Sequence, residues 1–351
     1  MRDVAVVSFS QAPMKRRELD RNEVEILMPV VAEAVERSGL PRHDIGFTCS
    51  GSCDYLQGQP FSFVMALDAV GAWPPIRESH VEMDAAWALY ESWVKMQTGE
   101  VDSALVYGFS RSSLGDLQEV LTLQLDPYTV APLWPTSVDL AALQARALLD
   151  SGRASERQMA EVAVRSRRDA KENGFAQLAG DFEVEKLLAE PHLVSPLRKH
   201  DCPPISDGAS AMVLAAGELA RKLCERPAWI TGIDHRVEPQ SLGVRDLTVS
   251  TSTKLAGEKA GVSRAGIDFA ELYAPFTHQE LILRDALGLW DDVAINPSGG
   301  VLAGHVMMAA GLTRIGEAAT RIMQGQAGRA VAHATSGPCL QQNLVCVLEG
   351  K

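Results

Sequence analysis

Two stretches of the chain share one order of elements, and this repeat limits the folds that the sequence can adopt. The first, residues 80–108, contains an apolar helical stretch at 85–96, then a glycine and an apolar run. The second, residues 296–333, contains a helical stretch at 306–323 followed by the same features. Each reads as a turn, a buried helix, a glycine stop and a buried strand. Two such units predict a duplicated α/β domain.

The segment between the two stretches has a different character. Residues 109–205 begin with proline-rich turns and continue into a polar amphipathic helix, which starts at Ser155 with the spacing of a capping box. The expected inner face of this helix consists of Met159, Val162, Ala163 and Ser166. We predict that this segment is an excursion from a first half at 1–221, and that a second half follows at 222–351.

The charge of the chain restricts its partners. It has 33 basic and 45 acidic side chains and a formal net charge of -12, which repels nucleic acid and anionic membrane surfaces.

No run approaches the roughly 20 apolar residues that a membrane span needs, and residues 1–10 read as a first buried strand rather than a secretory signal. Six cysteines are too sparse for a disulfide framework. We therefore expect a cytoplasmic protein.

Several segments resemble the thiolase superfamily, and more closely its sterol-carrier-protein thiolase and lipid-transfer branch. They are Ser206-Asp-Gly-Ala209, Tyr273-Ala-Pro-Phe276, Asn296-Pro-Ser-Gly-Gly300 with Gly304-His305, Leu340-Gln-Gln-Asn343 and, more weakly, residues 159–168. The resemblance implies the α/β thiolase fold, with two similar α/β halves in a five-layered αβαβα arrangement and a loop-domain insertion in the first half. It also implies that CoA enters as part of the substrate, with no permanently bound cofactor.

Two positions depart from the pattern of ordinary thiolases. Thiolases place a nucleophilic cysteine at the strand-to-helix turn of the first half, where the helix start makes a thiolate available. Here that turn carries Asp84 and Ala85, neither of which can form a thioester. Tyr273 stands at a His or Asn position of the family. Some lipid-transfer-type members with both departures are retro-aldolases of steroid side-chain β-hydroxyacyl-CoA. They work with a zinc-ribbon/OB-fold partner, so the resemblance implies this activity and partner.

The candidate catalytic residues lie at turns. His305 resembles the family histidine that helps to bind the thioester oxygen, and it would donate a hydrogen bond to an enolate oxyanion. Tyr273 would act as the base if its pKa were lowered or if it belonged to a relay. The alternatives are a structural histidine and a buried tyrosine with a satisfied hydroxyl. Asp84 is either an acid or base or a helix N-cap.

Other residues complete the expected site. Cys339 lies near the place of the second thiolase cysteine and could serve as a base or a nucleophile. We expect substrate binding by Asn296, Gly300 and Gly304, which lie in the segments that carry the resemblance. His278 lies one turn into its helix and could line the pocket, or it could be a surface or core histidine. Cys49 and Cys53 offer too few ligands for a metal, so we expect none.

Two other functions remain open at this point. A thiolase-like subunit without activity, supporting an acyl-CoA-processing complex, explains the absent cysteine equally well. An acyltransferase that uses Cys339 is the other. We also expect a homodimer or a thiolase-like heterodimer, formed through a sheet edge near the strand Ala104 to Tyr107.

Overall fold

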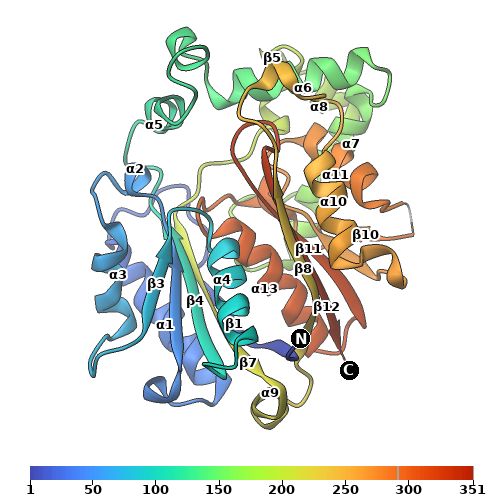
Figure 1. Cartoon of the computed structure of the whole chain (residues 1–351). Coiled ribbons are helices and arrows are strands. Elements are labelled where there is room, and N and C mark those ends of the chain that lie inside the picture. The colour runs from blue at the N-terminus through green and yellow to red at the C-terminus, as the bar shows by residue number, and fades with distance from the viewer. Residues whose placement is uncertain (291, 351) are drawn as a thin grey trace.

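The computed structural model describes residues 1–290 and 292–350. Within them, ten strands form one mixed sheet in the order β10-β9-β11-β12-β8-β1-β7-β4-β2-β3 (Figure 1). The strands of the first half are β1 (Val4–Gln11), β2 (Phe47–Gly51), β3 (Glu78–Val81), β4 (Ser103–Ser110) and β7 (Gly208–Ala216). Those of the second half are β8 (Ala228–Val237), β9 (Phe269–Glu271), β10 (Ala294–Ile295), β11 (Arg329–Ser336) and β12 (Gln342–Gly350).

The two halves repeat one strand order and one set of directions. In the first half β2 runs parallel to β3 and β4, and β7 runs antiparallel to β4 and β1. In the second half β9 runs parallel to β10 and β11, and β12 runs antiparallel to β11 and β8. The halves join where Ala5 pairs with Trp229 and Val6 with Ala228. The prediction of a duplicated α/β fold is confirmed.

Helices make three further layers around and between the two halves of the sheet. The middle layer consists of α4 (Ala85–Gln97) and α13 (Ala310–Met323), whose apolar side chains share one core cluster with both halves. The outer face of the first half is covered by α1 (Glu23–Ser38), α3 (Ser62–Val70) and α9 (Gly217–Leu223). The outer face of the second half is covered by α10 (Thr251–Ala260) and α11 (Thr277–Leu287). The expected five layers are therefore present.

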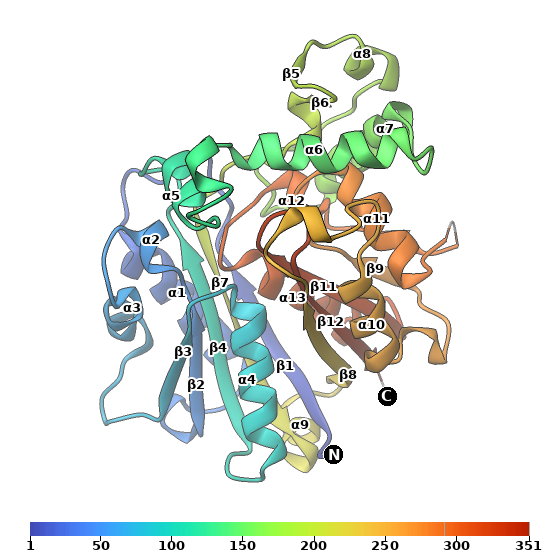
Figure 2. The same cartoon turned by 45° about the horizontal axis from the view of Figure 1, so that its top comes forward.

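The excursion crosses the end of the molecule opposite both termini, as Figure 2 shows. It contains α5 (Leu117–Leu123), α6 (Ser137–Asp150), α7 (Glu156–Asp169), α8 (Val184–Leu188) and the hairpin of β5 (His192–Val194) and β6 (Leu197–Arg198). The capping box at Ser155 is confirmed, and the four residues of the expected inner face are buried. Two short helices, α2 (Asp54–Gln57) and α12 (Gly300–Ala303), lie elsewhere. The predicted boundary after residue 221 falls inside α9.

Two expectations about elements were wrong. The strand from Ala104 to Tyr107 is not an edge, because β4 is paired with β7 on one side and β2 on the other; the edge strand of this half is β3. A short apolar run is equally typical of an interior strand. The helix expected from Val306 begins at Ala310, because Met308 takes a left-handed φ of 65°. No helix within the described ranges is long and apolar enough to cross a membrane.

Candidate active site

Tyr273 and His305 form a hydrogen-bonded pair in the second half. Tyr273 follows β9 and is only 5% exposed, whereas His305 lies between α12 and α13 and is partly exposed. The Tyr273 hydroxyl oxygen and the His305 Nε2 are 2.7 Å apart. Their rings meet edge to face, with centroids 5.4 Å apart. Two side chains that are 32 positions apart in the sequence are thus joined by one hydrogen bond.

The backbone at His305 is held by the first half. The His305 N–H donates to the Ser206 hydroxyl over 2.9 Å, and the Ser206 N–H donates to the His305 carbonyl over 3.1 Å. The Ser206 hydroxyl donates in turn to the side chain of Gln177. The Ser-Asp-Gly-Ala turn therefore lies directly against the loop that carries His305.

The surroundings of the pair keep both rings neutral. Burial raises the pKa of Tyr273 well above 10, and the charge of Asp84 adds to this effect while Arg314 opposes it. Desolvation by the surrounding protein lowers the pKa of His305 to about 4, although the residue is partly exposed, and Arg314 adds to this effect. Near neutral pH the pair consists of a phenol and an imidazole. A neutral imidazole can accept the proton of the phenol, whereas a free phenolate is disfavoured.

Asp84 lies where the middle helices begin. It is 1% exposed, and its Oδ1 accepts hydrogen bonds from the N–H groups of Ala86 (2.8 Å) and Leu312 (3.2 Å). Its Oδ2 accepts from the N–H of Gly311 (2.9 Å). Burial raises the pKa of Asp84 to about 6. Because both oxygens face backbone donors, this geometry favours the N-cap alternative over an acid or base.

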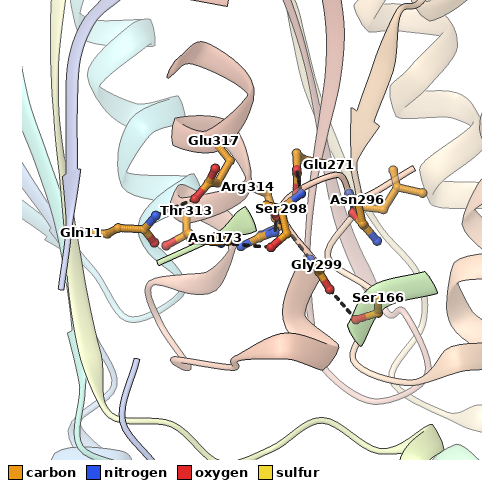
Figure 3. A network of polar contacts seen from close by, with 12 residues as sticks. Gln11, Ser166, Asn173, Glu271, Asn296, Ser298, Gly299, Thr313, Arg314 and Glu317 are labelled. Atoms are coloured by element: carbon orange, nitrogen blue, oxygen red, sulfur yellow. Dashed lines mark hydrogen bonds and ion pairs between the residues drawn. The ribbon is translucent and has the colours of Figure 1, made fainter. Parts of the chain in front are cut away.

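A buried ion pair lies against Ser298 of the Asn-Pro-Ser-Gly-Gly loop, as Figure 3 shows. Arg314 Nη1 lies 2.6 Å from Glu271 Oε2, and the two side chains are no more than 1% exposed. The N–H and the hydroxyl of Ser298 both donate to the Glu271 carboxylate. Our sequence reasoning missed this group. The available signal was a charged residue inside an apolar strand and another inside an apolar helix, which proteins tolerate chiefly as a pair.

Three expected substrate-binding residues shape the same loop. Asn296 has a φ of 52°; its Oδ1 accepts from the Leu272 N–H, and its Nδ2 donates to Glu280. A Cβ at Gly300 would come within 3.0 Å of the Asn296 side chain, and one at Gly304 within 2.5 Å of the Met14 sulfur. These close contacts explain the glycines, while contact of the three residues with a substrate stays a prediction.

The side chains of His278 and Cys339 make their polar contacts with α6. His278 is fully buried, with its Nε2 3.2 Å from the Gln144 side-chain oxygen, and burial lowers its pKa to about 3. The Cys339 thiol donates to the Leu140 carbonyl over 3.3 Å, and burial raises its pKa to about 12. A reactive cysteine needs a thiolate, which this environment disfavours.

The described part of the chain holds no group of three or more His, Cys, Asp or Glu side chains placed to bind a metal. The candidate site comprises the phenol–imidazole pair, the Asp84 carboxylate whose charge acts on Tyr273, and the glycine-rich loop.

The chain is similar to thiolase-type enzymes over nearly its whole length, although no protein-family model matches it. It is 26% identical to an acetyl-CoA acetyltransferase of Methanocaldococcus jannaschii, covering 90% of this chain and 89% of that protein. Sterol carrier protein 2 of Homo sapiens is 23% identical, over 69% of this chain and 51% of that protein.

Two solved structures have the same fold. An Ltp2-ChsH2(DUF35) aldolase superposes with a TM-score of 0.82 at 19% identity, covering 99% of this chain and 98% of that chain. The acetyl-CoA acetyltransferase of Bacillus anthracis gives a TM-score of 0.79 at 18% identity, covering 100% and 99%. Both likenesses include the two halves and the excursion.

Proposed function

Because this chain belongs to the thiolase superfamily and has its α/β fold, we propose that it cleaves a carbon–carbon bond of a β-hydroxyacyl-CoA by a retro-aldol reaction. The observation that carries the proposal is the 2.7 Å contact between the Tyr273 hydroxyl and His305 Nε2. CoA enters as part of the substrate. A subunit without catalytic activity would have no chemical need for a phenol–imidazole pair of this geometry.

The pair acts as a proton relay in this mechanism. The β-hydroxyl proton moves to the Tyr273 oxygen while the Tyr273 proton moves to His305 Nε2. The Cα–Cβ electron pair then passes into the thioester as an enolate, and the β carbon becomes the carbonyl carbon of a ketone or aldehyde. The proton returns through the pair to Cα, which yields the shortened acyl-CoA. His305 thus serves the relay rather than donating directly to the oxyanion.

Two observations support chemistry without an acyl-enzyme. The turn from β3 to α4 contains Asp84 and Ala85 and no cysteine, and we propose that one of these two residues stands where thiolases carry their nucleophile. The Cys339 thiol is buried against α6 with a raised pKa. An acyltransferase that uses Cys339 therefore has little support.

The partner in this proposal is a zinc-ribbon/OB-fold protein. The Ltp2-ChsH2(DUF35) aldolase shares the fold over 99% of this chain, and its name combines an aldolase with a DUF35 protein. We propose a partner of that type, a substrate with a steroid or lipid side chain, and a homodimeric or thiolase-like heterodimeric core.

The test is cleavage of a β-hydroxyacyl-CoA that carries a tertiary alcohol, measured as ketone release in the presence of the partner. We expect Tyr273→Phe and His305→Ala to lose roughly 10²–10⁴ of the wild-type rate, the usual contribution of a general base. Tyr107→Phe is the matched control, because Tyr107 is also buried but lies within β4 of the first half rather than at the Tyr273–His305 pair. It should retain the full rate.

Two results would contradict the proposal. Equal rates for wild type and the Tyr273 and His305 variants would rule out the proposed proton relay. A wild-type complex that binds CoA and releases no ketone would favour the non-catalytic subunit instead.

A further inference from the structure

Two helices from different halves of the fold begin at one carboxylate. α4 belongs to the first half and α13 to the second, and Asp84 accepts N–H groups from the first turns of both. The residue that precedes α13 is Ala309, which provides no side-chain cap. The free N–H groups at a helix start need an acceptor when they are buried. Asp84 therefore caps the helix of the other half as well as its own.

Two charges act on Tyr273, and only one of them is paired with an opposite charge within the described residues. On α13, Arg314 carries a positive charge that lowers the pKa of Tyr273, but its guanidinium is paired with Glu271 of β9. Glu317, one turn further along α13, accepts a hydrogen bond from Gln11. Tyr273 packs in the same core cluster as Ala85 and Ala310, the first residues of α4 and α13. Asp84 directly precedes α4, acts on Tyr273 through its charge, and is bonded to backbone N–H groups, which carry no net charge. The negative charge of Asp84 thus has no counterion among these contacts.

We propose that Asp84 is a positioning residue for the Tyr273–His305 pair, which fixes the starts of α4 and α13 against each other and presents a negative charge to Tyr273. A phenolate is disfavoured beside that charge, so Tyr273 loses its proton only by transfer to His305. The transfer step rests on the proposed function. The cap and the charge effect do not depend on it.

The Asp84→Asn variant removes the negative charge of the side chain and keeps nearly the same side-chain shape, so it tests the charge effect by itself. An asparagine keeps one oxygen for the N–H groups of Ala86 and Leu312, but its NH₂ group cannot accept from Gly311. We expect the acid dissociation constant of Tyr273 to rise about tenfold in this variant, the equivalent of one pKa unit. The measurement is phenolate absorption in protein that carries fluorinated tyrosine, which ionises at a pH where the fold is intact. Subtracting the Tyr273→Phe spectrum identifies the signal of Tyr273.

Asp201→Asn is the matched control for this titration. Asp201 is also 1% exposed, and it accepts the Arg198 N–H and the Thr277 hydroxyl. Its substitution removes a buried carboxylate whose charge is not among those that shift the pKa of Tyr273. The Tyr273 titration should be unchanged in this variant. An unchanged titration in Asp84→Asn, or an equal change in both variants, would overturn the proposed effect of the Asp84 charge on Tyr273. This outcome does not depend on which reaction the enzyme catalyses.

The cap is tested by adding formate to Asp84→Ala. That variant leaves three buried N–H groups without an acceptor at two helix starts, and a small carboxylate can occupy the vacated space. We expect formate to raise the melting temperature of Asp84→Ala more than that of wild type or Asp201→Ala. An equal effect on all three proteins would overturn the cap. If the aldolase reaction fails while the formate and titration results hold, only the proposed function is lost.

Discussion

Several titratable side chains of the site are buried in their neutral form, and this determines how the fold responds to acid. Burial lowers the pKa of His278 to about 3 and the pKa of His333 to about 4. In the unfolded chain histidine titrates near 6.5, so the unfolded state gains protons first and stability is lost as pH falls from about 6.5 to about 4. Asp84 acts in the opposite direction, because its pKa of about 6 lies above that of an unfolded aspartate.

His333→Gln should reduce the acid sensitivity. The glutamine keeps an amide donor for Asn343, which His333 Nε2 contacts at 3.0 Å, and it does not titrate. We expect the unfolding free energy to fall less between pH 6.5 and 4 than in wild type, by on the order of 3 kcal/mol. Urea denaturation across this range measures the difference. The exposed His43, changed to Gln, is the control, and identical slopes for wild type and His333→Gln would refute the prediction.

Only part of the site could be predicted from single residues. The turns that carry Tyr273 and His305 are marked by local motifs, and a cap at Asp84 follows from its place before an apolar helix. The bonds from Asp84 to Gly311 and Leu312 span 227 and 228 positions, and no local pattern reports such a contact. The Glu271–Arg314 pair was missed for the same reason.

Among the elements, α7 also holds the glycine-rich loop in place. The Ser166 hydroxyl donates to the Gly299 carbonyl over 2.5 Å, and Arg167 donates to the Leu302 carbonyl. Arg165 is paired with the buried Glu280, which also accepts from Asn296. The amphipathic pattern of α7 predicted a buried face, but its role in holding the loop appears only in the folded chain.

Arg165→Met should loosen that loop. It leaves Glu280 buried without its cation, and breaking a buried pair from one side costs about 3–5 kcal/mol. Arg157→Met on the same helix is the control, because Arg157 and Glu185 form an exposed pair of the kind that is worth about 0–1 kcal/mol. Chemical denaturation of both variants gives the comparison. A similar loss in the two would contradict a special role for Arg165.

At the scale of the whole molecule, the thiols lie in places that disfavour thiolates. Burial raises the pKa of Cys49, Cys202 and Cys339 to about 12, and it raises the pKa of Cys53, Cys224 and Cys346 as well. We therefore expect no acyl adduct by intact-mass analysis after incubation with acetoacetyl-CoA. Alkylation should be slow in the native protein and fast after unfolding, which provides the positive control. A stable adduct on any cysteine would refute this expectation.

The repeat explains why the overall fold could be predicted when much of the site could not. Two stretches of helix, glycine and strand are local patterns, and they led to the duplicated α/β domain, whereas the five layers were implied by the resemblance to thiolases. The edge position of β3 and the interior position of β4 depend on how strands are ordered across the sheet, which periodicity does not encode. The division of the chain after residue 221 stays a prediction.

The shared carboxylate at the two helix starts also bears on the history of the repeat. Two identical copies would each carry their own cap, yet here Asp84 serves both and its counterpart before α13 is Ala309. The second half thus depends on the first for an acceptor at the start of its central helix. Expressed alone, it would contain both Tyr273 and His305 and still lack the acceptor that anchors the helix beside them.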